Sequence, residues 1–209
     1  MISHALTIVI NELNEHLEVY KLQGNPAAKA ELGNLAEGFT SPSNLRDLLV
    51  MSVVNIREEK TLKNLPNYVR NEAKLRVSYE NPPVFLNFQI LLTATHANYN
   101  NALLVLSRGI RFFQSQNEFT QENVKPASIK TNAPPHILDQ LESFKLIFDL
   151  YSPTMEEVNH LWGTLGGKQY PFVVYTLRML DLKFRAVRSE SSLITEVAAE
   201  FHHKQPVAN

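Results

Sequence analysis

Residues 163–168 gather the groups that most invite a chemical interpretation. Gly163-Thr-Leu-Gly-Gly-Lys168 places three glycines and a lysine in one short run, a composition that resembles loops that cradle phosphates. A phosphate-binding loop, however, needs glycine where Trp162 stands and serine or threonine where Gln169 stands, and it runs from a strand into a helix. This segment is predicted to run from a helix into a strand. The pattern therefore favours a helix end over a nucleotide site.

Metal binding and hydrolysis are the other chemistries that the residue types could support. Among the seven histidines, His16 lies one helical turn after Glu12, but a pair without a third ligand is typical of a solvated surface pair. His202 and His203 are adjacent, so in an extended tail they point apart. The serines at 189–192 lack a Gly-x-Ser-x-Gly elbow. We therefore assign no catalytic, cofactor-binding or metal-binding residue.

Composition narrows the classes of partner. The net charge is −1, so no global basic field gathers phosphates, and nucleic acid is not an expected partner. The absence of cysteine suits folding in a reducing cytoplasm. The first residues mix polar and apolar types, which argues against a signal peptide. No run of about 18 apolar residues occurs, so we expect no membrane span.

Hydrophobic periodicity predicts a mixed order of helices and strands. Apolar residues recur at helical spacing in residues 2–20 and 98–113, and alternate with a period of two in residues 84–94. Further apolar segments predict strands at 48–56 and 144–150 and a long strand or bent pair at 172–188, while 61–83 and 117–140 are predicted to be connections. We expect an α/β (α+β) fold in two layers, with helices packed on one face of a mixed or mostly antiparallel sheet. Residues 1–188 are predicted to form one domain, and 189–209 a tail or arm.

A short helix is predicted between Ser152 and the glycines at 166–167. Ser152 is expected to cap the first turn, with Pro153 at the first helical position. A left-handed residue ends a helix without steric cost when it is glycine. Trp162 lies among apolar helical neighbours, so we expect it to anchor the helix to the sheet. His160 is expected to hydrogen-bond a nearby backbone group.

Several residues of this segment resemble a family signature. They are His160, Leu161, Trp162, Gly163, Leu165, Gly166, Lys168, Pro171, Tyr175, Arg178 and Met179. They are similar to the cap, or tail-terminator, family of phage-tail-like contractile injection systems of the antifeeding-prophage and virulence-cassette type. The N-terminal helix, Asn55–Glu59 and Pro83–Phe119 match the order of that family, so the resemblance covers residues 1 to 185.

The resemblance implies a structural protein that is not an enzyme. It implies a ring, a homo-hexamer, at the end of the particle far from the baseplate, where it ends polymerisation of the inner tube and sheath and receives extended sheath arms. The resemblance does not determine whether the protein contacts the tube, the sheath or a second cap subunit. It also does not determine which strand receives the sheath arm, the one at 48–56, at 144–150 or at 172–188. The protein is expected in the cytoplasm during assembly and then in a particle that is released or retained. Larger members of the family carry a further C-terminal domain.

Basic residues alternate with apolar ones near the end of the last predicted strand. They are Lys183, Arg185 and Arg188. Such alternation is typical of the wet face of a strand, and the alternative is a positive patch at an oligomer or sheath contact. For the whole chain, the alternatives to a cap are a soluble adaptor or effector-loading protein of the same system, and an enzyme of a type that no motif reveals.

Overall fold

A computed structural model describes most of the chain, in two compact units. The described residues are 1–21, 28–37, 45–62, 66, 68–81, 84–141, 143–182 and 187–192. The main unit comprises Met1–Leu62 and Val84–Leu182, and the small unit comprises Lys63–Pro83 and Lys183–Asn209. Each unit contains its own β-sheet, so we describe each by itself.

The main unit is built on a six-stranded mixed sheet with the order β1-β2-β5-β8-β7-β6. Only β1 and β2 pair in parallel, and every other neighbouring pair is antiparallel. The long central strands β5 and β8 are apolar along most of their length, as expected for strands with cover on both faces. The strands are β1 (Ala30–Leu32), β2 (Leu49–Glu58), β5 (Val84–Ala94), β6 (Glu118–Thr120), β7 (Lys145–Tyr151) and β8 (Phe172–Leu182).

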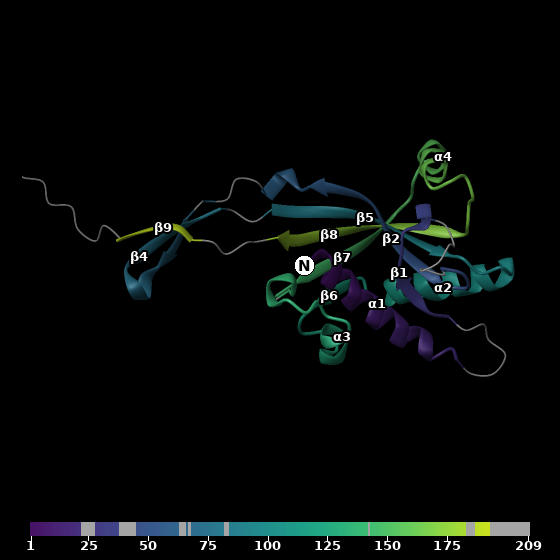
Figure 1. The fold of residues 1–209 in the computed structure, drawn as a ribbon, viewed down its shortest axis with the longest axis horizontal. Coiled ribbons are helices and arrows are strands. Elements are labelled where there is room, and N and C mark those ends of the chain that lie inside the picture. Colours follow the sequence, from purple (N-terminus) through teal and green to yellow (C-terminus); the bar gives the residue numbers. More distant parts are fainter. Residues whose placement is uncertain are drawn as a thin grey trace, which may run out of the picture. The chain divides into compact units, whose positions relative to one another are not determined.

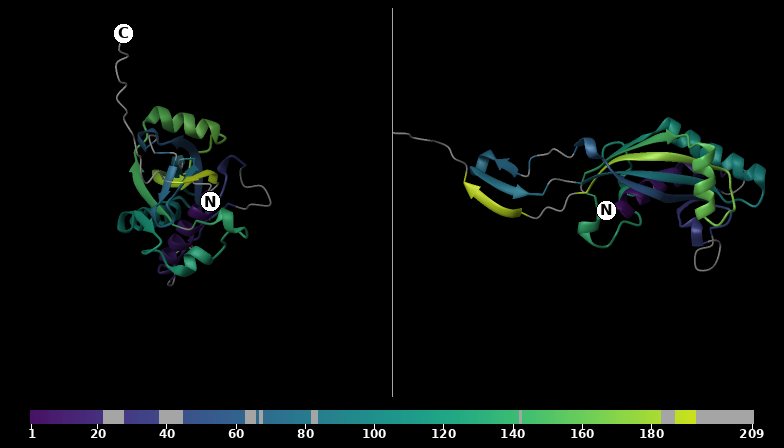
Figure 2. Two further views of the ribbon diagram at one scale, coloured as in Figure 1. Left: turned by 90° about the vertical axis from the view of Figure 1, so that its left-hand side faces the viewer. Right: turned by 90° about the horizontal axis from the view of Figure 1, so that it is seen from above.

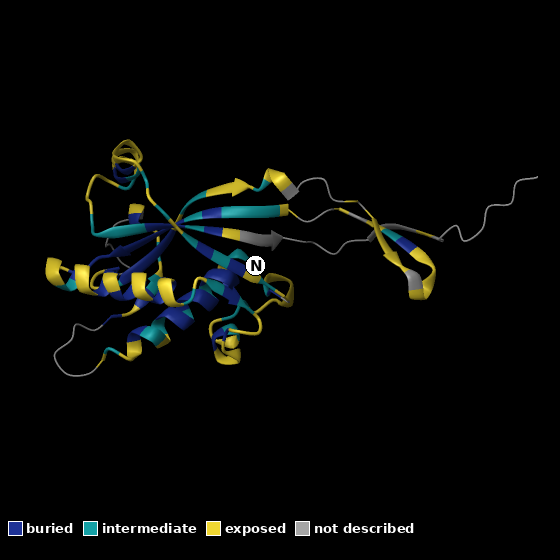
Figure 3. Ribbon diagram, turned by 180° about the vertical axis from the view of Figure 1, so that it is seen from behind, coloured by how far each residue is buried: buried dark blue, intermediate teal, exposed yellow. Residues whose placement is uncertain are grey.

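Three helices cover one face of this sheet: α1 (Ile2–Glu18), α2 (Tyr99–Ser115) and α3 (Pro126–Lys130) (Figure 1). Alternate β5 residues Phe88, Ile90 and Leu92 point into the core beneath them and are fully buried. The buried stripe of α1 packs into the same core, while α2 keeps an exposed outer side (Figure 3). At one side of this core, aromatic rings pack against one another. They belong to Phe112, Phe113, Phe119, Phe148 and Tyr175.

A fourth helix, α4 (Met155–Thr164), lies on the opposite face of the sheet (Figure 1). Its buried residues Val158 and Trp162 pack on Val50, Leu91 and Val174, which alternate with the residues that face the larger core. The predicted fold class, α/β with a mixed sheet and packed helices, is confirmed. The helix on the second face was not predicted, because apolar residues on both faces of β5 do not reveal which helix covers which face.

The small unit is a three-stranded antiparallel sheet. Its strands are β3 (Tyr68–Asn71), β4 (Arg76–Glu80) and β9 (Val187–Ser192), in the order β3-β4-β9. The prediction of a connection at 61–83 was therefore wrong for the residues in β3 and β4. These strands are short and polar, and β4 pairs with a strand more than one hundred residues away in the chain, so local periodicity does not reveal them. That 1–188 form one domain stays a prediction.

Short 3₁₀ turns complete the described segments. They are η1 (Leu35–Glu37), η2 (Lys60–Leu62), η3 (Glu72–Lys74) and η4 (Ile137–Asp139). In the described part of the chain, no helix has the length and apolar character needed to cross a membrane.

Candidate interaction surfaces

The beginning of α4 is held by a capping box. The Thr154 hydroxyl accepts a hydrogen bond from the Glu157 backbone N–H (3.3 Å), and the Glu157 carboxylate accepts one from the Thr154 N–H (2.8 Å). The prediction that Ser152 caps the helix was wrong, because Thr154 has the acidic residue three positions later that a capping box requires. The Thr154 backbone bond and the Tyr151 hydroxyl, which donates to Glu157 (2.8 Å), hold the pKa of this carboxyl below its usual value.

The end of α4 follows the predicted glycine stop. Gly166 and Gly167 have φ angles of 92° and 76°, in the left-handed region that favours glycine. The Gly167 N–H donates to the carbonyl of Trp162 (2.8 Å), the long-range bond of a Schellman motif. This bond fixes the turn through which the chain passes from α4 towards β8.

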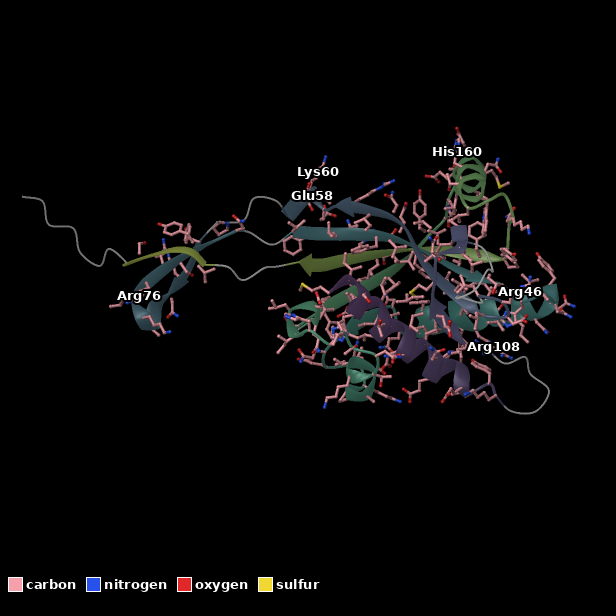
Figure 4. All side chains as sticks on the ribbon, in the orientation of Figure 1. Arg46, Glu58, Lys60, Arg76, Arg108 and His160 are labelled. Atoms are coloured by element: carbon pink, nitrogen blue, oxygen red, sulfur yellow. The ribbon has the colours of Figure 1, made fainter. Side chains whose placement is uncertain are left out.

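Trp162 lies inside the smaller core, as expected. The side chain is 5% exposed, and its ring makes an edge contact with Phe172 at a centroid distance of 5.4 Å. The indole N–H has no hydrogen-bond partner among the described residues. His160 projects into solvent from the outer side of α4 (Figure 4). Its ring lies 3.8 Å from the Glu156 carboxylate and not against a backbone group, as had been predicted for its hydrogen bond. Trp162 thus has a packing role, while His160 lies at the surface.

Some of the other predicted signature residues lie away from Trp162. Tyr175 faces the larger core on the opposite side of the sheet, where burial raises its pKa to about 12. Arg178 is exposed and pairs with Asp149 at 2.7 Å. The Pro171 carbonyl accepts a hydrogen bond from Ala94 N–H (3.0 Å). Signature residues on both faces of a sheet do not converge on one site.

The remaining predicted positions differ in burial and in whether the structure describes them. Leu161 and Leu165 are partly buried against the smaller core, while Gly163 and Lys168 are exposed. Met179 lies in β8, Arg188 lies in β9, and their side chains are outside the described part of the structure. Lys183 and Arg185 lie outside the described residues. The basic patch therefore stays a prediction.

The Glu12–His16 pair does not form a metal site. The Glu12 carboxylate accepts a hydrogen bond from the Lys125 N–H (3.1 Å), and the His16 ring packs against Tyr20 and Phe112. Burial, and then the charge of Arg111, lower the pKa of His16. Across the residues that the structure describes, no three His, Asp or Glu side chains are grouped so as to hold a metal ion.

The three strands that were predicted as candidates to receive a sheath arm differ in how much open sheet edge they offer. Strand β8 is paired on both sides, with β5 and β7, so it offers no edge. Strand β1 covers β2 only at Leu49–Met51, which leaves residues 53–58 of β2 without a neighbour on that side among the described strands. On β7, β6 pairs with 145–147 and leaves only 149–151. The longer open edge is therefore the distal half of β2.

The open part of β2 carries exposed side chains of mixed character. Val53 is 37% and Ile56 50% exposed, Arg57 and Glu58 are also exposed, and a β-bulge interrupts the pairing with β5 between Val53 and Asn55. Glu58 extends from the end of this strand beside η2 (Figure 4). Bulges and charged residues at an edge restrict unspecific strand pairing. The edge is thus accessible but selective.

Comparisons with known proteins agree with one another. The chain resembles the sheath/tube terminator of an extracellular contractile injection system, PVC, in the extended state, with 15% identity and a TM-score of 0.60, over 96% of this chain and 64% of that one. It also resembles the tube-terminating cap of the anti-feeding prophage, with 13% identity and a TM-score of 0.58, over 92% and 60% of the two chains. The chain thus spans less than two thirds of either structure.

The family comparison rests on sequence alone. A search of curated proteins found no significant match. The family model described as the Pvc16 N-terminal domain matches residues 5–196, which include every strand described above and every helix except the first three residues of α1. This chain therefore belongs to the Pvc16 N-terminal domain family.

Proposed function

We propose that this protein is the cap of a contractile injection system, ending the polymerisation of tube and sheath. The observation that carries the proposal is the family match over residues 5–196, with a fold shared by two terminators of such systems. In this role the protein is structural and uses no cofactor. Its partners are sheath and tube subunits, and a second cap subunit where the system has one. Its place is a particle assembled in the cytoplasm that functions outside the cell.

We propose further that the cap is a closed ring, a homo-hexamer. A growing helical tail exposes identical interfaces at its end. A closed ring can match those interfaces on one face and present nothing to copy on the other. Residues 1–188 would form the body of each subunit and 189–209 its arm, with Lys183, Arg185 and Arg188 as a basic patch at a subunit or sheath contact.

The open edge of β2 is the proposed dock for a sheath arm. An extended segment can add a strand to such an edge through main-chain hydrogen bonds. The topology favours β2 over the alternatives, since β8 is central and β7 leaves only residues 149–151 open. The bulge and charges at this edge favour a dedicated partner over adventitious pairing.

Particles made without this protein test the function. We expect tails of variable length with frayed distal ends when the gene is deleted, and uniform length when it is restored. Electron microscopy of purified particles gives both length and end structure. Uniform tails with intact ends in the deletion strain would refute the proposal.

A further inference from the structure

Residues 136–141 hold two apolar side chains out in solvent. Ile137 is 76% and Leu138 63% exposed, and they are adjacent in the short turn η4. We call this pair the apolar knob. Single exposed apolar residues are common on protein surfaces, but two neighbours displayed together on a turn require a further reason.

The loop that carries the knob is tightly bonded. Leu138 N–H donates to Nδ1 of His136 (3.2 Å), and the Gln140 side chain donates to the Pro134 carbonyl (2.8 Å). Leu141 N–H donates to Nδ1 of His4, a side chain only 1% exposed on α1 (2.9 Å). Because Nδ1 accepts, Nε2 of His4 carries the hydrogen and donates to the Ile129 carbonyl (2.9 Å). The knob is therefore preorganised, which lowers the entropic cost of binding.

A complementary hollow lies beside the N-terminal half of α2. It has a volume of about 460 Å³ and is lined by α2 residues Tyr99, Leu103 and Leu106 and by residues 169–172. Tyr99 is 65% and Leu103 41% exposed. We call this hollow the α2 groove. Its volume is within the range of pockets that accept side chains or small ligands.

The knob and the groove lie at opposite ends of the main unit. The groove includes Phe172, the first residue of β8, whereas the knob precedes β7, whose first half pairs with the far part of β8 at Arg178. In the right-hand view of Figure 2, the long strands of the six-stranded sheet run along the main unit between these ends. One subunit therefore cannot fill its own groove with its own knob.

We infer that the apolar knob of one subunit seats in the α2 groove of the next copy of this chain, and this inference rests on the proposed ring. Charge supports the pairing, because Asp139 follows the knob, while exposed Lys168 precedes groove residue Gln169. A contact between two different surfaces is heterologous, and such contacts form a ring when the rotation from one copy to the next closes.

Cysteine crosslinking tests the contact directly, because the chain has no native cysteine. Leu138→Cys and Leu103→Cys are made separately, mixed in equal amounts and treated with a short bismaleimide, as free protein and in assembled particles. We expect crosslinked dimers in the mixture and none with either variant alone. A variant that carries both Leu138→Cys and Leu103→Cys should give a ladder of covalent oligomers. Val19→Cys, at a position 71% exposed on the C-cap of α1, replaces Leu138→Cys as the matched control.

The outcomes separate this contact from the function. A double variant, Ile137→Asp with Leu138→Asp, should keep the thermal unfolding temperature and lose at least nine tenths of its presence in particles. The contact is overturned if the mixture gives no more dimer than the control in either preparation, if Leu138→Cys crosslinks to itself, or if it crosslinks to sheath or tube. If the crosslinks form but deletion of the gene for this protein leaves tail length unchanged, the contact is supported and only the cap function is refuted.

Discussion

At the scale of single residues, Trp162 shows how a side chain that resembles a site component serves packing. It fills the smaller core between α4 and the sheet, where Val158 is its helical neighbour. We expect Trp162→Ala to lower the free energy of unfolding by about 3–5 kcal/mol, as typical for a buried tryptophan. His160→Ala, two residues away and exposed, should change it by no more than about 0.5 kcal/mol. Urea denaturation of both variants measures this, and equal effects would contradict the packing role.

Tyr175 predicts a dependence of stability on alkaline pH. Burial raises its pKa from 10.0 to about 12, so the folded protein keeps the phenol protonated while the unfolded chain begins to lose that proton at pH 10. Since the unfolded state then binds fewer protons, stability is complete below pH 10 and falls as pH rises towards 12. Tyr175→Phe should flatten this fall relative to the parent. Urea denaturation at several pH values measures it, and parallel curves for both proteins would refute the burial effect.

At the scale of elements, the capping box of α4 predicts which of two hydroxyl residues matters. Thr154→Ala removes the side-chain acceptor for the Glu157 N–H and should cost about 1 kcal/mol. Ser152→Ala, outside the helix and exposed, should cost under about 0.5 kcal/mol. Thermal unfolding compares the two variants. A greater loss at Ser152 would mean that the helix begins earlier than the structure shows.

The open edge of β2 makes a prediction about assembly. Ile56→Lys places a charge on an exposed residue of that edge, and an edge lysine opposes addition of a strand. We expect about tenfold weaker incorporation into particles, equivalent to the loss of one or two net hydrogen bonds. Leu150→Lys on β7, where 61% of the residue is exposed, is the matched control and should incorporate normally. The intensity of this protein's gel band in purified particles measures incorporation. An equal effect of both changes would exclude β2 as the specific dock.

Elements differ in how far the sequence reveals them. The alternation in 84–94 predicts β5 almost to the residue, because one face of that strand is buried from Phe88 onward. Strands β3 and β4 were missed, since they are exposed and depend on pairing with each other and with β9. The α2 groove could not be foreseen, because it joins residues about seventy positions apart. Pro134, Pro135 and His136 do mark a turn, but not the exposure of the two residues that follow.

At the scale of the whole molecule, the two units differ in what sustains them. Among the residues that the structure describes, both hydrophobic cores consist of main-unit residues alone. Among the side chains that the structure describes in the strands of the small unit, Val77 is the one buried apolar residue, and small sheets without a packed core are marginal in water. Stability of the chain is therefore expected to reside in the main unit.

A truncated chain tests this division. Glu58 pairs with Leu86, so a short Gly-Ser linker can replace residues 63–83, and the chain can end at Leu182. We expect this variant to unfold in one cooperative transition, with a denaturation midpoint close to that of the full chain, because every residue of both cores remains. Far-UV circular dichroism during urea denaturation measures the midpoint. A variant that is unfolded or strongly destabilised would show that the small unit supports the main fold through contacts outside the two cores.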